Sequence, residues 1–202
     1  MRYFGLLLTS INIVMSLVLF PARSLITFAT NWNMLLTFIS VLLCSLFVKD
    51  SRVNEKRQRL VTLHIIMEFA MILNLITFII YWGVIHSVSI SRFSGWAYIH
   101  MYTVHTFPTL AYFLNFRCTD FQLVAGHWKM FLPLSVVYST INYFETKSRG
   151  SPLYWFLTWE DHNTVLILVA LQVIFSLLWV ALARLTRRDA SAEQVSENKR
   201  KN

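Results

Sequence analysis

Six long apolar stretches follow one another along the chain, and they constrain its fold more than any other feature. Each is close to the roughly 20 apolar residues that a helix needs to cross a bilayer. Hydrophobic residues make up 56 % of the chain and charged residues only 14 %. The sequence therefore predicts an all-α, polytopic membrane protein with six transmembrane helices. The stretches are Phe4–Phe20, Trp32–Val48, Leu60–Ile85, Tyr98–Phe116, Trp128–Phe144 and Thr164–Leu182.

The basic residues between the stretches predict an orientation. Six spans place both termini on one side, and that side carries 14 of the 18 Lys and Arg residues, against 4 on the other. Because cytosolic loops are enriched in Lys and Arg, we expect both termini in the cytosol. The net charge of +8 then indicates topology and attraction to anionic membrane lipids, and it does not indicate a nucleic-acid partner. The larger group is Arg2, Lys49, Arg52, Lys56, Arg57, Arg59, Arg117, Lys129, Arg184, Arg187, Arg188, Lys199, Arg200 and Lys201; the smaller is Arg23, Arg92, Lys147 and Arg149.

The loops leave no room for a second folded domain, so we expect one transmembrane domain over residues 1–188. Residues 189–202, DASAEQVSENKRKN, are polar and charged, and this composition predicts a disordered tail. The final Lys-Arg-Lys-Asn is similar to a dibasic retrieval signal, which favours the endoplasmic reticulum membrane over the plasma membrane. A solvated basic tail is the plainer interpretation of the same four residues.

Polar side chains inside a bilayer are costly, and they mark candidate functional residues. Thr37 lies five residues past Trp32, and His105 lies seven residues past Tyr98. The helical rise therefore puts both side chains roughly 8–10 Å below the outer face. A nucleophile and its general base must come within about 2.6–3.2 Å, so a shared depth is a condition for a catalytic pair. Thr37 and His105 are thus a candidate threonine–histidine dyad.

Three neighbouring features bear on this candidate. Asn33 lies one turn before Thr37 on the same helical face, where it is a candidate for orienting the hydroxyl or donating to an oxyanion. Pro108 cannot donate to the Val104 carbonyl, which predicts a kink beside His105. A threonine in a membrane helix usually bonds its own preceding turn, and this structural role stays open for Thr37.

Other polar residues carry weaker signals. His64 and Glu68 are four residues apart and are interpreted as a structural pair on the cytosolic half of the third stretch. The sequence contains no Gly-x-Ser-x-Gly motif, no phosphate-binding loop and no cysteine–histidine cluster with metal-ligand spacing. We therefore expect no metal site and no cofactor. We expect the aromatic segment Ser151–Asp161, SPLYWFLTWED, on the outer side. It is either an interfacial anchor or a gate for the entry of a lipid chain.

Three segments resemble one family. The sequence NWNMLLTFISVLL around Thr37 and the sequence HTFPTLAYFLNFR around His105 are similar to the two conserved blocks of the androgen-induced membrane protein family. SPLYWFL is similar to the Tyr-Pro-Phe-Leu-like loop of that family. The resemblance extends from the second stretch through the sixth. It implies a multi-pass hydrolase with a threonine nucleophile, a histidine partner and fatty acid esters of hydroxy fatty acids as substrates.

Together these features predict an intramembrane lipid ester hydrolase without a cofactor. In this hypothesis Thr37 attacks the ester carbonyl after His105 takes its proton, and water then hydrolyses the acyl-threonine. Two alternatives stay open. One is a non-enzymatic transporter or membrane scaffold. The other is an intramembrane haem protein with histidine ligands, which the different depths and faces of His64, His100 and His105 disfavour.

Overall fold

The computed structural model describes residues 2–47, 57–116 and 122–201, and helices joined by loops account for these residues without a strand. The described residues of each of the six apolar stretches are helical, so the all-α prediction is confirmed for the described chain. The chain divides into two compact units, Met1–Asp120 and Phe121–Asn202, within the range for which the sequence predicts one domain. The basic residues Lys49, Arg52, Lys56 and Arg117, which the charge argument uses, lie outside the described residues.

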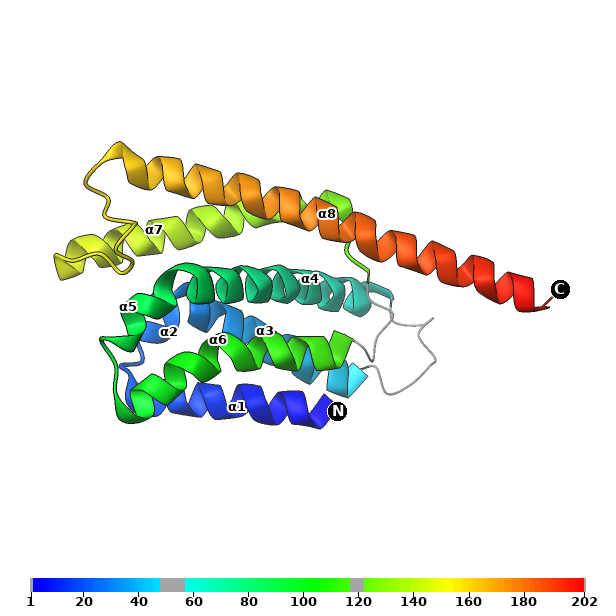
Figure 1. Cartoon of the computed structure of the whole chain (residues 1–202), viewed down its shortest axis with the longest axis horizontal. Coiled ribbons are helices and arrows are strands. Elements are labelled where there is room, and N and C mark those ends of the chain that lie inside the picture. The colour runs from blue at the N-terminus through cyan, green and yellow to red at the C-terminus, as the bar shows by residue number, and fades with distance from the viewer. Residues whose placement is uncertain (1, 48–56, 117–121, 202) are drawn as a thin grey trace. The chain divides into compact units, whose positions relative to one another are not determined.

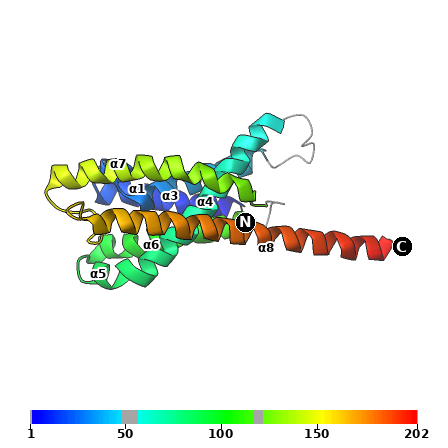
Figure 2. The ribbon, with the colours of Figure 1, turned by 90° about the horizontal axis from the view of Figure 1, so that it is seen from above.

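The first unit is built on four long helices that run along one axis (Figures 1 and 2). They are α1 (Arg2–Leu19), α3 (Ala29–Phe47), α4 (Arg57–Ile80) and α6 (Gly95–Phe116), with the short α2 (Ser24–Thr27) between α1 and α3. Helix α3 contacts α1, α4 and α6, and α6 also contacts α1 and α4. The core of this unit therefore lies between α3 and α6, the two helices that carry Thr37 and His105.

A small residue lets α1 and α6 approach closely. A Cβ atom added to Gly5 would lie 3.3 Å from the Ala111 carbonyl oxygen and 3.4 Å from a Val41 methyl group. Small residues are typical of such contacts in membranes, because lipid-immersed helices associate through close backbone packing. Gly5 therefore permits α1 to pack closely against α6 at the level of Ala111.

The helix that begins as α4 changes its winding before it ends. Residues Tyr81–Ile85 form a π-helical segment, η2, and α5 (His86–Ile90) follows without a loop. A π-helical turn inserts an extra residue into the ladder and changes the direction of the side chains that follow, and such turns are frequent at functional sites. Here the turn begins at Tyr81, which is almost fully buried.

The second unit consists of η3 (Ala125–Met130), α7 (Phe131–Arg149) and α8 (His162–Lys201), with an aromatic loop between α7 and α8. Helix α7 ends at Arg149, and the following Gly150 has a φ of +67°, the left-handed conformation that commonly terminates helices. Helix α8 continues to Lys201 and so includes residues 189–201, for which the sequence predicts a disordered tail.

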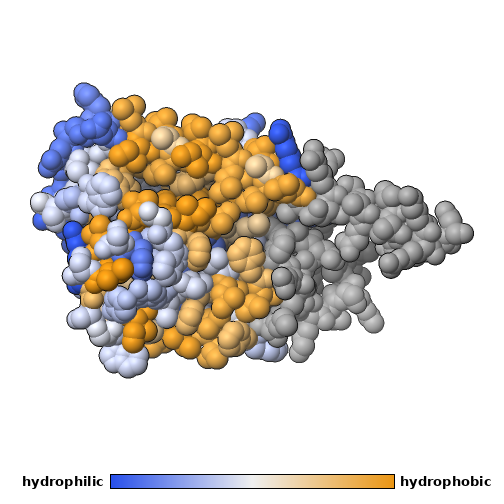
Figure 3. Space-filling model, viewed as in Figure 1, coloured by the Kyte–Doolittle hydropathy of each residue, from blue (hydrophilic) through white to orange (hydrophobic). Residues whose placement is uncertain are grey.

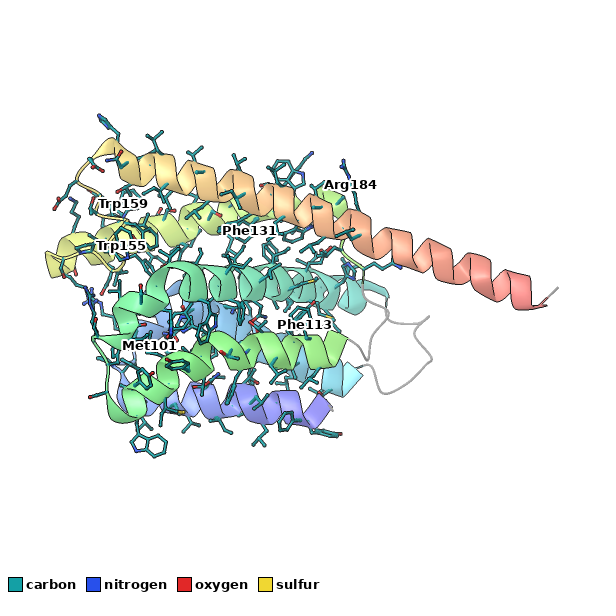
Figure 4. The ribbon with its side chains drawn as sticks, in the orientation of Figure 1. Met101, Phe113, Phe131, Trp155, Trp159 and Arg184 are labelled. Carbon is teal, nitrogen blue, oxygen red and sulfur yellow. The ribbon has the colours of Figure 1, made fainter. Side chains whose placement is uncertain are left out.

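Trp159 anchors the aromatic loop, and Figure 4 labels it with Trp155. Its φ of +59° is rare for a residue with a side chain. Three bonds hold it: its backbone N–H donates to Thr164 Oγ1 at 3.0 Å, its carbonyl accepts from Lys147 Nζ at 3.2 Å, and its indole N–H donates to Asn142 Oδ1 at 2.7 Å. The loop is therefore a fixed structure that α7 and α8 hold at one end of the second unit.

Three helices of the described chain are long and apolar enough to cross a membrane. The spans are Ala29–Leu46, Val61–Ile90 and His162–Leu185, and α1 adds a shorter apolar helix, Tyr3–Leu19. Only 6 % of the His162–Leu185 span is buried, so its apolar side chains are mostly exposed. Figure 3 shows this apolar surface over α8 and hydrophilic side chains near the α7–α8 loop. An exposed apolar surface of this extent suits a lipid environment.

Candidate functional site

His105 lies at the middle of α6 and is held in one orientation. Its imidazole is 5 % exposed, and Nδ1 lies 2.6 Å from the Met101 carbonyl oxygen, one turn earlier in the same helix. Figure 4 labels Met101 at this turn. A carbonyl oxygen only accepts, so Nδ1 carries the proton that is donated to it, and Nε2 of the neutral ring is left as an acceptor. The backbone therefore selects the tautomer that a general base requires.

The side chain that faces His105 Nε2 is Thr30. Its Oγ1 lies 3.1 Å from Nε2, and with the ring neutral its hydroxyl donates to that nitrogen. Thr30 is the second residue of α3, and its side chain is partly exposed. The pair thus has the distance that is expected of a hydroxyl nucleophile and its general base.

Tyr81 covers one face of the His105 imidazole. The two ring centroids are 3.6 Å apart and the planes differ by only 9°. The π-helical turn of η2 begins at Tyr81, and the tyrosine hydroxyl lies 3.5 Å from Ser89 Oγ and from His86 Nδ1. A buried, stacked ring of this kind restricts rotation of the imidazole out of the Thr30–Met101 line. The irregular end of α4 therefore contributes directly to the position of His105.

An aromatic cluster adjoins Tyr81 at the same end of the first unit. Trp82 and His86 both contact the Tyr102 ring edge-on, and Tyr98 and Tyr102 share a hydrogen bond of 2.6 Å between their hydroxyls. Edge-on aromatic pairs are stabilising beyond the area they bury. These rings join η2 and α5 to the start of α6, and so they help to hold Tyr81 against His105.

Thr37 lies in a separate, fully buried network of amides. Its Oγ1 accepts from Asn74 Nδ2 at 2.8 Å and donates over a longer 3.5 Å to Asn33 Oδ1. Asn33 Nδ2 in turn donates to Asn74 Oδ1 at 3.0 Å. Thr109 of α6 reaches the same Asn74 oxygen at 3.5 Å. The network connects α3, α4 and α6 in the centre of the first unit.

The structure does not bring Thr37 and His105 into contact. Among the described residues no hydrogen bond joins them. His105 pairs instead with Thr30, which lies seven residues before Thr37 in α3. Seven residues correspond to about 10 Å of helical rise. The α3 hydroxyl that meets His105 is therefore about two turns before the one that the sequence predicts. The catalytic roles of Thr37 and His105 stay predictions.

Thr30 is the residue that the sequence analysis missed. The predicted apolar stretch starts at Trp32 and therefore leaves out Thr30. Its spacing from Thr37 carried a signal, because residues seven apart lie on the same helical face. Asn33 faces Thr37 as predicted, and Pro108 lies inside α6, which continues through it to Phe116.

A second imidazole–hydroxyl pair lies between α1 and α6. His100 Nε2 is 3.0 Å from Ser16 Oγ, and Asn12 Nδ2 donates to the Thr103 carbonyl at 2.9 Å. His100 therefore faces α1 while His105 faces α3, which confirms that the two histidines point to different faces of α6. They do not converge as a pair of ligands.

The remaining sequence candidates have structural partners. His64 Nε2 and Glu68 Oε1 lie 3.4 Å apart within α4, as the sequence predicts for a structural pair. In the described part of the chain, no group of three or more His, Cys, Asp or Glu side chains is placed to hold a metal ion. The chemistry that this arrangement offers is proton transfer between a hydroxyl and a neutral imidazole.

Comparisons with known proteins identify no relative: no family model, no curated protein and no solved structure matches the chain. The function is therefore inferred from the contacts of His105 and from the resemblance of the short segments around Thr37, His105 and the aromatic loop.

Proposed function

We propose that the chain is an integral membrane protein of six helical spans with both termini in the cytosol. Three helices that satisfy the length and composition of a span support this proposal, as do the apolar α1 and the distribution of Lys and Arg. Helices α6 and α7 carry more polar residues, which is expected where such side chains face other helices. The endoplasmic reticulum is the proposed membrane.

Within that membrane, we propose, the protein hydrolyses lipid esters. The observation that carries the proposal is the fixed His105 imidazole, whose Nδ1 is held by the Met101 carbonyl and whose Nε2 receives a threonine hydroxyl from α3. A buried base with this tautomer activates a hydroxyl without a metal or cofactor. The segment resemblance supplies the substrate class, fatty acid esters of hydroxy fatty acids, and nominates Thr37 as the nucleophile.

The reaction proceeds in two steps. His105 Nε2 takes the proton of the threonine hydroxyl as Oγ attacks the ester carbonyl, and the alcohol part of the lipid leaves with that proton. Water then attacks the acyl-threonine, with His105 again as the base, and the free fatty acid leaves. Both steps require only the hydroxyl, the imidazole and water.

His105→Gln tests this function. Full-length protein in lipid nanodiscs is assayed with a palmitic acid ester of hydroxystearic acid, and product is measured by mass spectrometry. We expect hydrolysis to fall by about 10²–10⁴-fold, which is the usual contribution of a general base. His162→Gln is the matched control, because His162 is exposed at the start of α8 in the other unit. Wild-type protein that does not hydrolyse the ester, or an active His105→Gln variant, contradicts the proposal and favours a transporter or scaffold.

A further inference from the structure

We propose that Thr30, and not the Thr37 that the segment resemblance nominates, is the catalytic hydroxyl that His105 activates. This inference rests on the hydrolase function proposed above. Thr30 Oγ1 lies 3.1 Å from His105 Nε2, within the range of a nucleophile and its base. The opposite nitrogen is fixed by Met101 at 2.6 Å, and Tyr81 is stacked on the ring. These three contacts hold Nε2 on the Thr30 hydroxyl before any substrate is bound.

Access distinguishes Thr30 from Thr37. Thr30 is partly exposed, whereas Thr37 is fully buried among side chains of α3, α4 and α6. An ester carbonyl has to reach the attacking oxygen, and the Thr37 oxygen already accepts the Asn74 amide at 2.8 Å. An acyl group on Thr37 would displace that amide and enter a filled core, which is costly in a close-packed interior. Thr30 carries neither obstacle.

The acyl transfer balances with groups that are already in place. The Thr30 hydroxyl proton moves to His105 Nε2 as the bond between Thr30 Oγ and the acyl carbon forms. The ester C–O bond then breaks, and the proton on Nε2 goes to the departing alkoxide, which leaves as the alcohol of the hydroxy fatty acid. Water hydrolyses the acyl-Thr30 ester and restores the hydroxyl. No oxidant, reductant or metal takes part.

The position of the acyl group tests this assignment. Full-length protein in nanodiscs is mixed with p-nitrophenyl octanoate and quenched in acid within milliseconds, and fragment ions of the peptide that contains Thr30 and Thr37 locate the octanoyl group. We expect the adduct on Thr30. We also expect Thr30→Val, which keeps the shape and removes the hydroxyl, to lower p-nitrophenol release by at least about 100-fold, because it removes the nucleophile.

Matched variants separate this role from folding. Thr30→Ser keeps a hydroxyl and should retain the adduct and a rate within about tenfold of wild type. Thr140→Ala removes an exposed hydroxyl that bonds only the preceding turn of α7, and should leave both readouts unchanged. Thr37→Val should keep the adduct on Thr30.

Each outcome decides between the two proposals. An octanoyl group on Thr37 overturns the role of Thr30 and leaves the hydrolase intact. Hydrolysis without any threonine adduct, at a rate that Thr30→Val does not change, also overturns it and means that His105 activates water. Wild-type protein that hydrolyses neither the nitrophenyl ester nor the lipid ester removes the hydrolase and the role of Thr30 together.

Discussion

The Asn74 side chain joins α3, α4 and α6 through a single buried amide group, and Asn74→Ala is the sharpest test of how this bundle is held together. The amide donates to Thr37 Oγ1 at 2.8 Å and accepts from Asn33 Nδ2 at 3.0 Å. Both bonds cross from α4 to α3. The 3.5 Å contact from Thr109 is long and adds little.

The magnitude follows from these two bonds. Interhelical hydrogen bonds in membrane proteins average about 0.6 kcal/mol and reach about 1.7 kcal/mol. Two of them therefore amount to about 1–3 kcal/mol of the free energy of unfolding. The upper part of the range is expected, because Asn33 and Thr37 are buried and lose a partner that water cannot replace.

Unfolding with sodium dodecyl sulfate in mixed micelles, followed by tryptophan fluorescence, measures this loss. Asn163→Ala is the control, because Asn163 is exposed and bonds only Asp161 in the aromatic loop. A double-mutant cycle of Asn74→Ala with Asn33→Ala isolates the coupling energy between the two amides. We expect this coupling to stabilise the folded protein. Asn74→Ala protein within about 0.5 kcal/mol of wild type, the range of ordinary surface substitutions, would refute the argument.

Two further substitutions test the positioning of the site and the end of α7. Tyr81→Leu removes the ring stacked on His105 and should lower kcat/KM for p-nitrophenyl octanoate by about 2- to 10-fold, the value of one aromatic pair. Tyr81→Phe keeps the ring, and its kcat/KM should stay near that of wild type. Equal losses of kcat/KM in both variants would contradict the role of stacking. Gly150→Ala places a side chain at φ +67° and should lower the free energy of unfolding by about 1–2 kcal/mol, whereas an unchanged unfolding midpoint would show that the turn adapts.

The apolar stretches predicted the helices well because burial in a bilayer imposes length and composition on each segment separately. Where the sequence places an apolar stretch from Tyr98 to Phe116, the helix runs from Gly95 to Phe116. The pairing of His64 with Glu68 was also predictable, because both residues lie in one helix at a fixed spacing. These predictions depend only on geometry within a helix.

The partner of His105 was not predictable in the same way. The sequence prediction measures depth from Trp32 and Tyr98 as though both residues lay in one plane. In the structure, His105 lies ten residues into α6 and faces the second residue of α3. That offset depends on how far α6 is shifted along its neighbours, which close contacts such as Gly5 with Ala111 determine. The hydropathy pattern of a helix carries no information about its shift along a neighbouring helix.

The two histidines of α6 show the boundary between these cases. His100 and His105 are five residues apart, and five steps of an α-helix turn the side chain by about 140°, so different faces follow from the sequence alone. Which hydroxyl each imidazole meets, Ser16 of α1 or Thr30 of α3, depends on the neighbouring helix and its height. Only one of the two imidazoles also has its second nitrogen held by a carbonyl and its ring covered by a tyrosine from a π-helical turn. That combination supports our proposal that His105 serves chemistry. The carbonyl belongs to α6 itself, whereas the tyrosine comes from an irregularity in α4 that the apolar pattern does not reveal.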